Sequence, residues 1–453
     1  MSTDDRLSPQ TRKVVLALVF GAVLPLLDTS IVNIAVHSLS GVFGAPVVRT
    51  QWVITGYGLA SALAIPLSGW ATRRFGAARV WITALAAFTI TSILCASAWS
   101  IESLIAFRLV QGLAAGFSIP LMQTLMVTSA DKAQATRAMT AVGLPAIIAP
   151  AIAPLLGGVL LDVFGWRSIF LINVPIGIAA VLLALRHLRR GPADHATRFD
   201  SIGYLLLAPG LLAAVYGLTT VGPQASRIGS VLLFAGALLI AGYVLHTRRV
   251  PSPLVDITLF IRRSFTSAWL TLVIASIVFY GGLFLIPLHY QQNFAYTAFA
   301  AGLLLALQSV GAYFSRMMIN RLTGRWGACA TAYLFIACAV VGTLPFAVPV
   351  GQTAGWPIVQ GVGLLVRGGG IGALTVLTMS ATYHQLTPGE VVHASTVSRL
   401  ATQLGSALGV VVCTILIAIT GGVQSTTFLY LTAFTALMAI TAVWLPRGPI
   451  VRK

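Results

Sequence analysis

The sequence predicts an all-α protein that crosses a membrane many times. Of its 453 residues, 57% are hydrophobic and only 8% are charged, and the mean hydropathy is +0.92, far from the composition of soluble domains. Apolar runs of about 20 residues recur from Val14 to Leu445, and each could cross about 30 Å of hydrocarbon as a helix. The ten-residue alternation typical of a transmembrane β-barrel does not occur in the sequence. The expected architecture is therefore a helix bundle.

Polar breaks between the apolar runs predict fourteen spans. They cover residues 14–36, 51–71, 80–99, 103–127, 138–161, 168–185, 201–221, 228–245, 265–288, 298–315, 328–348, 357–380, 394–420 and 427–445. With a cytoplasmic N-terminus, only three of the 28 lysine and arginine residues, Arg49, Arg167 and Arg227, fall in outer loops. Because cytoplasmic loops carry an excess of basic residues, this orientation is favoured and both termini are expected in the cytoplasm.

The composition argues against several classes of function. The three lysines do not follow the glycine pattern of a phosphate-binding loop, so the chain should contain no ATPase. The four cysteines lie inside apolar runs without C-x-x-C spacing, and no H-E-x-x-H pattern occurs, so no metal is expected. The seven histidines fall near span ends or in loops, where a solvated or interfacial role is expected. The net charge of +18 is explained by loop arginines that set the topology, and does not indicate nucleic-acid binding.

Two similarities at long range indicate an internal repeat. Residues 72–77 (TRRFGA) resemble residues 323–328 (TGRWGA) at an offset of 251, and Arg108 corresponds to Arg367 at an offset of 259. Duplicated halves are typical of transporters, although short glycine and arginine strings can also match by chance. The expected organisation has three parts: a six-helix half (1–185), two inserted helices with their linkers (186–264) and a second six-helix half (265–453).

Several segments resemble the fourteen-span drug:proton antiporters of the major facilitator superfamily, the EmrB/QacA-like branch. Those that carry the resemblance are residues 27–35 (LDTSIVNIA), 69–76 (GWATRRFG), 108–112 (RLVQG) and 166–177 (WRSIFLINVPIG). The resemblance implies the major facilitator fold, with two six-helix halves and two inserted helices. It also assigns a part in conformational change to a set of loop and fifth-span residues: Gly69, Arg73, Arg74, Gly76, Pro154, Gly157 and Gly158.

The sequence departs from the family pattern at two places. Arg73 stands where the loop motif usually has an acidic residue, which puts in doubt an acidic latch between the halves. Residues 149–158 (APAIAPLLGG) depart from the glycine-proline and double-glycine pattern of the antiporter motif. Alanine at 149 and 153 still permits close helix contact, and the proline and the double glycine are retained. Antiport therefore stays the expected mode of transport, although these two motifs support it less strongly than an exact match would.

Asp28 is the most informative single residue. Burying an ionised aspartate near mid-span costs at least about 3 kcal/mol on insertion scales, and the other nine acidic residues lie at span ends or in loops. Burial favours the neutral carboxyl and a nearby arginine favours the ionised one, so a proton could be exchanged there. We therefore expect Asp28 to couple transport to protons, and Arg108 to adjust how readily Asp28 binds a proton. The alternative is that Asp28 and Arg108 form a purely structural ion pair.

Further polar and apolar side chains within the spans are candidates for substrate contact. They are Asn33, Tyr57, Gln111, Met122, Gln123, Tyr280, Phe284, Gln308, Gln360 and Arg367. Arg108, Gln111 and Met122 follow helical spacing that would line a cavity. Packing in the bundle is the alternative explanation for most of this set.

The function expected is export of amphipathic small molecules, driven by a proton gradient without a cofactor, through alternating access. A monomer in the bacterial inner membrane is expected, with small molecules, protons and lipid as its partners. A dedicated exporter of one metabolite, antibiotic or lipid is the alternative within transport. A membrane receptor or an enzyme embedded in the bilayer is disfavoured, because no catalytic constellation is visible in the spans.

Overall fold

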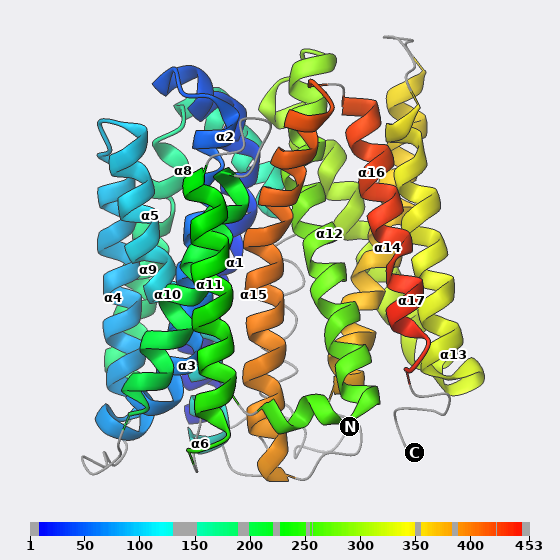
Figure 1. The fold of residues 1–453 in the computed structure, drawn as a ribbon. Helices are drawn as coiled ribbons and strands as arrows, with labels where there is room; N and C mark the ends of the chain where they lie inside the picture. The colour runs from blue at the N-terminus through cyan, green and yellow to red at the C-terminus, as the bar shows by residue number, and fades with distance from the viewer. Residues whose placement is uncertain are drawn as a thin grey trace. The chain divides into compact units, whose positions relative to one another are not determined.

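The computed structural model describes residues 9–129, 152–188, 199–220, 227–250, 254–255, 257–348, 355–382, 388–422 and 424–445. These residues are helical almost throughout (Figure 1). The chain divides into two compact units, residues 1–199 and 200–453. The second unit includes the two helices, near residues 201–221 and 228–245, that the sequence analysis places between the halves. The expected division of the chain into three parts stays a prediction.

The first unit contains one long helix of 35 residues and several shorter ones. Its elements are α1 (Pro9–Phe43), α2 (Val47–Thr50), α3 (Trp52–Phe75), α4 (Ala77–Ala96), α5 (Ile101–Gly116), α6 (Ser118–Ser129), a helix over Ile152–Phe164 whose last turn is π-helical, α8 (Ser168–Leu171) and α9 (Asn173–His187). Helix α5 packs against α3 and α4, and α9 packs against α1 and α4. The hydrophobic core of the unit is built from side chains of α1, α3, α4, α5, α6 and α9, and Leu18, Trp81 and Phe88 are almost fully buried in it.

The second unit is built around three long helices. Its elements are α10 (Ser201–Thr220), α11 (Arg227–Thr247), a 3-10 helix (Ile257–Ile261), α12 (Arg263–Asn293), α13 (Ala298–Ala347), α14 (Trp356–Thr382), α15 (Pro388–Ile419), α16 (Gln424–Ala436) and α17 (Met438–Ala442). Helix α14 packs along α13, α15 packs along α12, and α10 pairs with α11. Glycines permit the closest of these approaches: a β-carbon at Gly368 or Gly311 would overlap the backbone of the facing helix.

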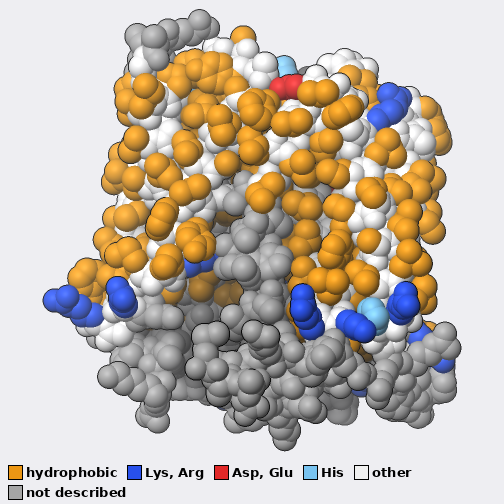
Figure 2. Space-filling model, turned by 180° about the vertical axis from the view of Figure 1, so that it is seen from behind, with side chains coloured by type: hydrophobic (Ala, Val, Ile, Leu, Met, Phe, Trp, Pro, Cys, Tyr) orange, Lys and Arg blue, Asp and Glu red, His pale blue; other side chains and the backbone are white. Residues whose placement is uncertain are grey.

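The all-α membrane fold is confirmed. Among the described residues, thirteen helices are long and apolar enough to cross a membrane, and Ile152–Phe164 is a shorter apolar helix. The expected fifth span, 138–161, begins outside the described residues. Several helices extend beyond their apolar runs; α1 reaches Phe43 although the run ends near residue 36. Figure 2 shows hydrophobic side chains over the flanks of the helices, with most lysine and arginine side chains close to one end.

The loop motif of the first unit has a counterpart in the second. Gly76 ends α3 with φ 85°, and Gly327 interrupts α13 with φ 78°, so α13 consists of two helices that meet at a bend. L-residues rarely adopt such angles, which explains a glycine at both places. The two turns lie 251 residues apart, as an internal repeat predicts. Arg73 and Gly69 are exposed beside the first turn, and Arg74 is half-buried.

Candidate functional site

Asp28 lies in α1, one turn after a proline. The polar side chains next to Asp28 donate hydrogen bonds to carbonyl groups of α1 itself. Pro25 has no N–H, and the Thr29 hydroxyl donates to the Pro25 carbonyl at 2.7 Å while that of Ser30 donates to Leu26 at 3.2 Å. Asn33 likewise donates to the Thr29 carbonyl. The Asp28 carboxylate is therefore the group in this polar run that reaches other helices, and it is completely buried.

Arg108 of α5 reaches that carboxylate across the first unit. Its Nη1 lies 2.5 Å from Asp28 Oδ2, and its Nε donates to the Val53 carbonyl of α3 at 3.0 Å. The guanidinium carbon lies 4.0 Å from the centre of the Tyr57 ring, a cation–π distance. Close contact of α5 with α3 makes this reach possible, because a β-carbon at Gly112 would overlap the Tyr57 backbone. Arg108 is only 1% exposed.

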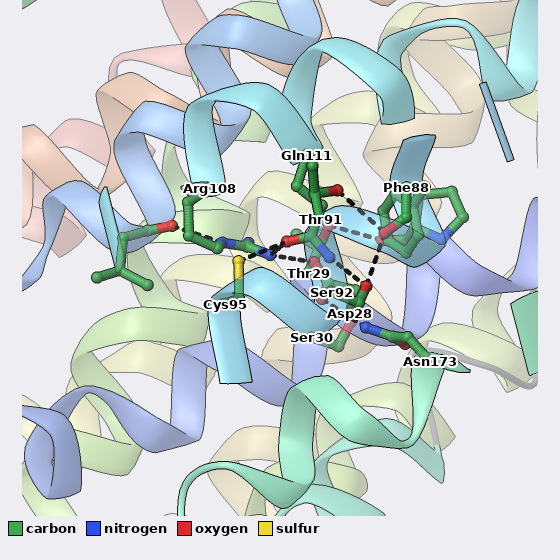
Figure 3. Close-up of polar contacts among 12 residues, drawn as sticks. Asp28, Thr29, Ser30, Phe88, Thr91, Ser92, Cys95, Arg108, Gln111 and Asn173 are labelled. Carbon is green, nitrogen blue, oxygen red and sulfur yellow. Dashed lines mark hydrogen bonds and ion pairs between the residues drawn. The ribbon is translucent and has the colours of Figure 1, made fainter. Parts of the chain in front are cut away.

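Gln111 extends the network from α5 to α4. Its Oε1 accepts a bond from Arg108 Nη1 at 2.6 Å, and its Nε2 donates to the Ser92 hydroxyl at 2.7 Å (Figure 3). Ser92 in turn donates to the Phe88 carbonyl, and the Cys95 thiol lies 3.6 Å from Gln111 Oε1. Gln111 thus uses both ends of its amide within the protein, which holds the guanidinium in place.

Asn173 is the member of the network that the sequence analysis missed. It begins α9, is completely buried, and its Nδ2 donates to Asp28 Oδ1 at 2.9 Å. Its own Oδ1 is buried without a hydrogen-bond partner in the structure. The signal available in the sequence is an asparagine within the apolar segment that follows Trp166, where an amide needs a partner.

Two side chains contact the Asp28 carboxylate among the described residues. Both contacts of the carboxylate are with donors, Arg108 and Asn173, which suits the ionised form. A protonated Asp28 needs an acceptor for its O–H. Rotation of the Asn173 amide by half a turn would bring its oxygen to the carboxyl O–H and would place the amide N–H groups where that oxygen now lies.

The other candidates of the first unit occupy different surroundings. Tyr57 lies against Arg108, and Asn33 is buried with an unpartnered Oδ1. Met122 packs against the hydrophobic core of the unit, while the side chain of Gln123 lies outside the described residues. Pro154, Gly157 and Gly158 are buried, and Gly157 packs closely on Ile31 of α1. Substrate contact by these residues stays a prediction.

Among the described residues of the second unit, one buried arginine, Arg367, has no carboxylate beside it. Arg367 of α14 donates through Nη1 to Gln308 Oε1 and through Nη2 to the Val278 carbonyl at 2.7 Å, and its Nε has no partner. In the part of the chain that the structure describes, no acidic side chain lies within ion-pair distance of it. Phe284 is fully buried in α12 and Tyr280 is half-buried one turn before it.

The sequence expectation for one histidine is wrong. A position near a span end predicts a solvated or interfacial His289, but its side chain is only 6% exposed and hydrogen-bonded to Gln424 and Gln360. Long helix α12 continues past its apolar run to Asn293, and α14 and α16 cover this last stretch. Gln360 therefore does not share a site with Arg367, although both lie on one face of α14.

Comparison with known proteins decides the family. The model of the Major Facilitator Superfamily matches residues 18–410. The chain belongs to the major facilitator superfamily. It is 31% identical to the "Multidrug resistance protein B homolog" of Mycobacterium tuberculosis (strain ATCC 25618 / H37Rv) over 420 residues, 92% of this chain and 78% of that protein. It is 33% identical over 293 residues to the "Multidrug export protein EmrB" of Escherichia coli (strain K12), covering 64% of this chain and 57% of that protein.

Solved structures of other transporters share the fold. The crystal structure of the POT family transporter PepTSo aligns with a TM-score of 0.74 at 15% identity, covering 97% of this chain and 98% of that one. Together with the thirteen apolar helices, the family makes this chain a multi-pass transporter of small molecules in the bacterial inner membrane, and not an enzyme.

Proposed function

We propose that this transporter exports amphipathic small molecules of several kinds in exchange for protons. The observation that carries the proposal is the completely buried Asp28, held between Arg108 and Asn173. Relatives with 31–33% identity are named for multidrug resistance and export, which supports the direction and the breadth of substrates. Acidic residues buried in membrane helices are functional far more often than structural.

Protonation would change the contacts between helices of the first unit. The ionised Asp28 attracts Arg108 and so links α1 with α3, α4 and α5 through the guanidinium and Gln111. A neutral Asp28 loses most of that attraction, while Arg108 keeps the Val53 carbonyl, Gln111 and the Tyr57 ring. The helix α1 is then less tightly held, and this is the step that we propose to accompany the switch between inward-open and outward-open states.

The proposed transporter works as a monomer and needs no cofactor. One proton moving down about 100 mV supplies roughly 2.3 kcal/mol, enough for about a 50-fold gradient of a neutral substrate. A single coupling carboxylate therefore suffices for efflux that protects a cell.

The test is transport by the purified chain in liposomes with an imposed pH gradient. Wild type should accumulate a lipophilic dye against its gradient, and Asp28→Asn should lose that accumulation while retaining exchange of dye across the membrane without a gradient. Glu102→Gln is the matched control, since Glu102 is exposed and pairs with Arg49 at the surface. Gradient-driven accumulation by Asp28→Asn at the wild-type rate would refute the coupling role.

Arg367 favours a second candidate, a dedicated exporter of an amphipathic molecule that bears a carboxylate. Asp28 is already neutralised by Arg108, so the uncompensated charge among these three buried groups is the positive one of Arg367. An anionic substrate would offset it, whereas a cation would add to it. A relative from Neisseria gonorrhoeae, 33% identical over 69% of this chain and 62% of its own length, is named "Fatty acid resistance protein FarB". Export of fatty acids but not cationic dyes, lost in Arg367→Gln, would favour this candidate over the multidrug exporter.

A further inference from the structure

His289 lies in the second unit among groups that carry no charge. Four aromatic rings surround its imidazole at centroid distances of 5.4–5.7 Å, those of Tyr290, Phe294, Phe346 and Phe428. The polar neighbours are Gln424 of α16, Gln360 of α14 and Asn293 of α12. The titratable side chain in direct contact is Tyr290, with Tyr296 stacked on its far side. In the described residues, no acidic or basic side chain forms an ion pair with His289.

The amide of Gln424 fixes what the first ring nitrogen does. Gln424 Nε2 donates to Gln292 Oε1 at 2.7 Å, which turns Gln424 Oε1 toward His289. That oxygen lies 2.9 Å from His289 Nδ1 and also accepts from Asn293 at 3.0 Å. Asn293 Nδ2, a donor, also lies 3.0 Å from His289 Nδ1. In the tautomer with a proton on Nδ1, both Nδ1 and Asn293 donate to Gln424 Oε1, and this is the tautomer considered below.

The second ring nitrogen faces an amide that can adapt. Gln360 Nε2 lies 3.2 Å from His289 Nε2, so in the neutral imidazole Nε2 is unprotonated and accepts from Gln360. Gln360 Oε1 is buried without a partner. A half-turn of the Gln360 amide would place this oxygen on Nε2, where it would accept a hydrogen bond from a protonated imidazolium. Gln360 thus has a reserve acceptor that the neutral histidine does not use.

We propose that His289 is a second proton-binding site of the transporter and that Gln360 accommodates both of its protonation states by rotating its amide. In the neutral state Gln360 donates to Nε2; when Nε2 gains a proton, the amide turns and accepts from it. Nδ1 keeps its bond to Gln424 in both states, and the surrounding aromatic rings lie within the range in which ring electrons stabilise a cation. Most buried polar atoms in proteins are hydrogen-bonded, and a second protonation state of His289 would give the buried Gln360 oxygen a partner.

This site would give the second unit its own response to protons, a role that rests on the proposed proton-driven export. Asp28 and Asn173 in the first unit show the same combination of a titratable group and an amide with a free oxygen. Binding of the proton itself does not depend on what is transported, so it can be measured separately.

The experiment is nitrogen NMR of the full chain, labelled at histidine and held in lipid nanodiscs. The His289 signal is assigned by its loss in His289→Gln, and His37→Gln serves as the control because His37 is an exposed histidine of the first unit. In wild type, the assigned signal should change from neutral to cationic imidazole between about pH 8 and pH 5. In Gln360→Leu, which removes the reserve acceptor, this change should be lost over the same range.

A His289 signal that stays neutral from pH 8 to pH 5 in wild type would overturn the proposal, as would an unchanged titration in Gln360→Leu. Transport in liposomes then separates the two proposals. Protonation of His289 without gradient-driven export in wild type would leave the proton site intact and refute the proposed function instead.

Discussion

The ion pair of Asp28 and Arg108 should have a large coupling energy, because both side chains are almost fully buried. Removing the charge in Arg108→Gln leaves the carboxylate with Asn173 as its remaining donor and should lower the free energy of unfolding by about 3–5 kcal/mol. Asp28→Asn keeps one acceptor oxygen for Arg108 and should cost about 2–4 kcal/mol, since charge-assisted bonds become neutral ones.

The double variant should be much less unstable than the sum of the two single variants. It contains no buried charge in this network, and its two amides can hydrogen-bond to each other, so we expect a loss of about 2–4 kcal/mol in place of about 5–9 kcal/mol. The coupling energy is then about 3 kcal/mol or more. If a single variant does not fold, recovery of folded protein in the double variant reports the same coupling.

The assay is reversible unfolding of the full chain in detergent micelles for all four members of the cycle. The surface pair of Arg49 and Glu102 is the control: its side chains are 63% and 57% exposed at an N–O distance of 3.3 Å, so its coupling should be about 0–1 kcal/mol. A coupling energy for Asp28 and Arg108 as small as that of the surface pair would show that these two side chains do not stabilise each other in the folded protein.

Three further outcomes follow from the same network. Gly112→Val should push α5 away from α3 and cost about 1–3 kcal/mol in unfolding experiments, whereas Gly69→Ala, with open space around it, should change stability by less than about 0.5 kcal/mol. Asn173→Leu should slow gradient-driven transport at least about 10-fold while the purified protein keeps its helical content, because the carboxylate loses both its second donor and its reserve acceptor; wild-type transport would contradict this. Arg108→Lys keeps the charge but cannot reach the carboxylate and the Val53 carbonyl together, so it should recover less than half of wild-type transport, and full recovery would show that charge alone suffices.

Some functional residues can be identified from the amino-acid sequence because the free-energy cost of burying them can be inferred from the residues around them. Asp28 and Arg108 are charges inside apolar runs, and such charges need partners wherever the chain folds. Asn173 and His289 give a weaker signal in the sequence, because an uncharged side chain costs less to bury than a charge. An asparagine at the start of a helix and a histidine near the end of a span both have water or headgroups as plausible partners, so their positions along the chain do not indicate burial.

The sequence alone determined the class of fold, the approximate spans and the repeated motif that contains Gly76 and Gly327, where the structure shows a glycine turn. These depend on local quantities: the length of an apolar run, and a backbone angle that only glycine adopts readily. Tertiary structure decided which polar groups meet. It joined Asp28 to Asn173 across 145 positions of the chain and His289 to Gln424 across 135. In the part of the chain that the structure describes, it placed Gln308, and no carboxylate, beside Arg367. Hydrogen bonds act over about 3 Å, so such pairings follow from how the helices pack and not from spacing along the chain.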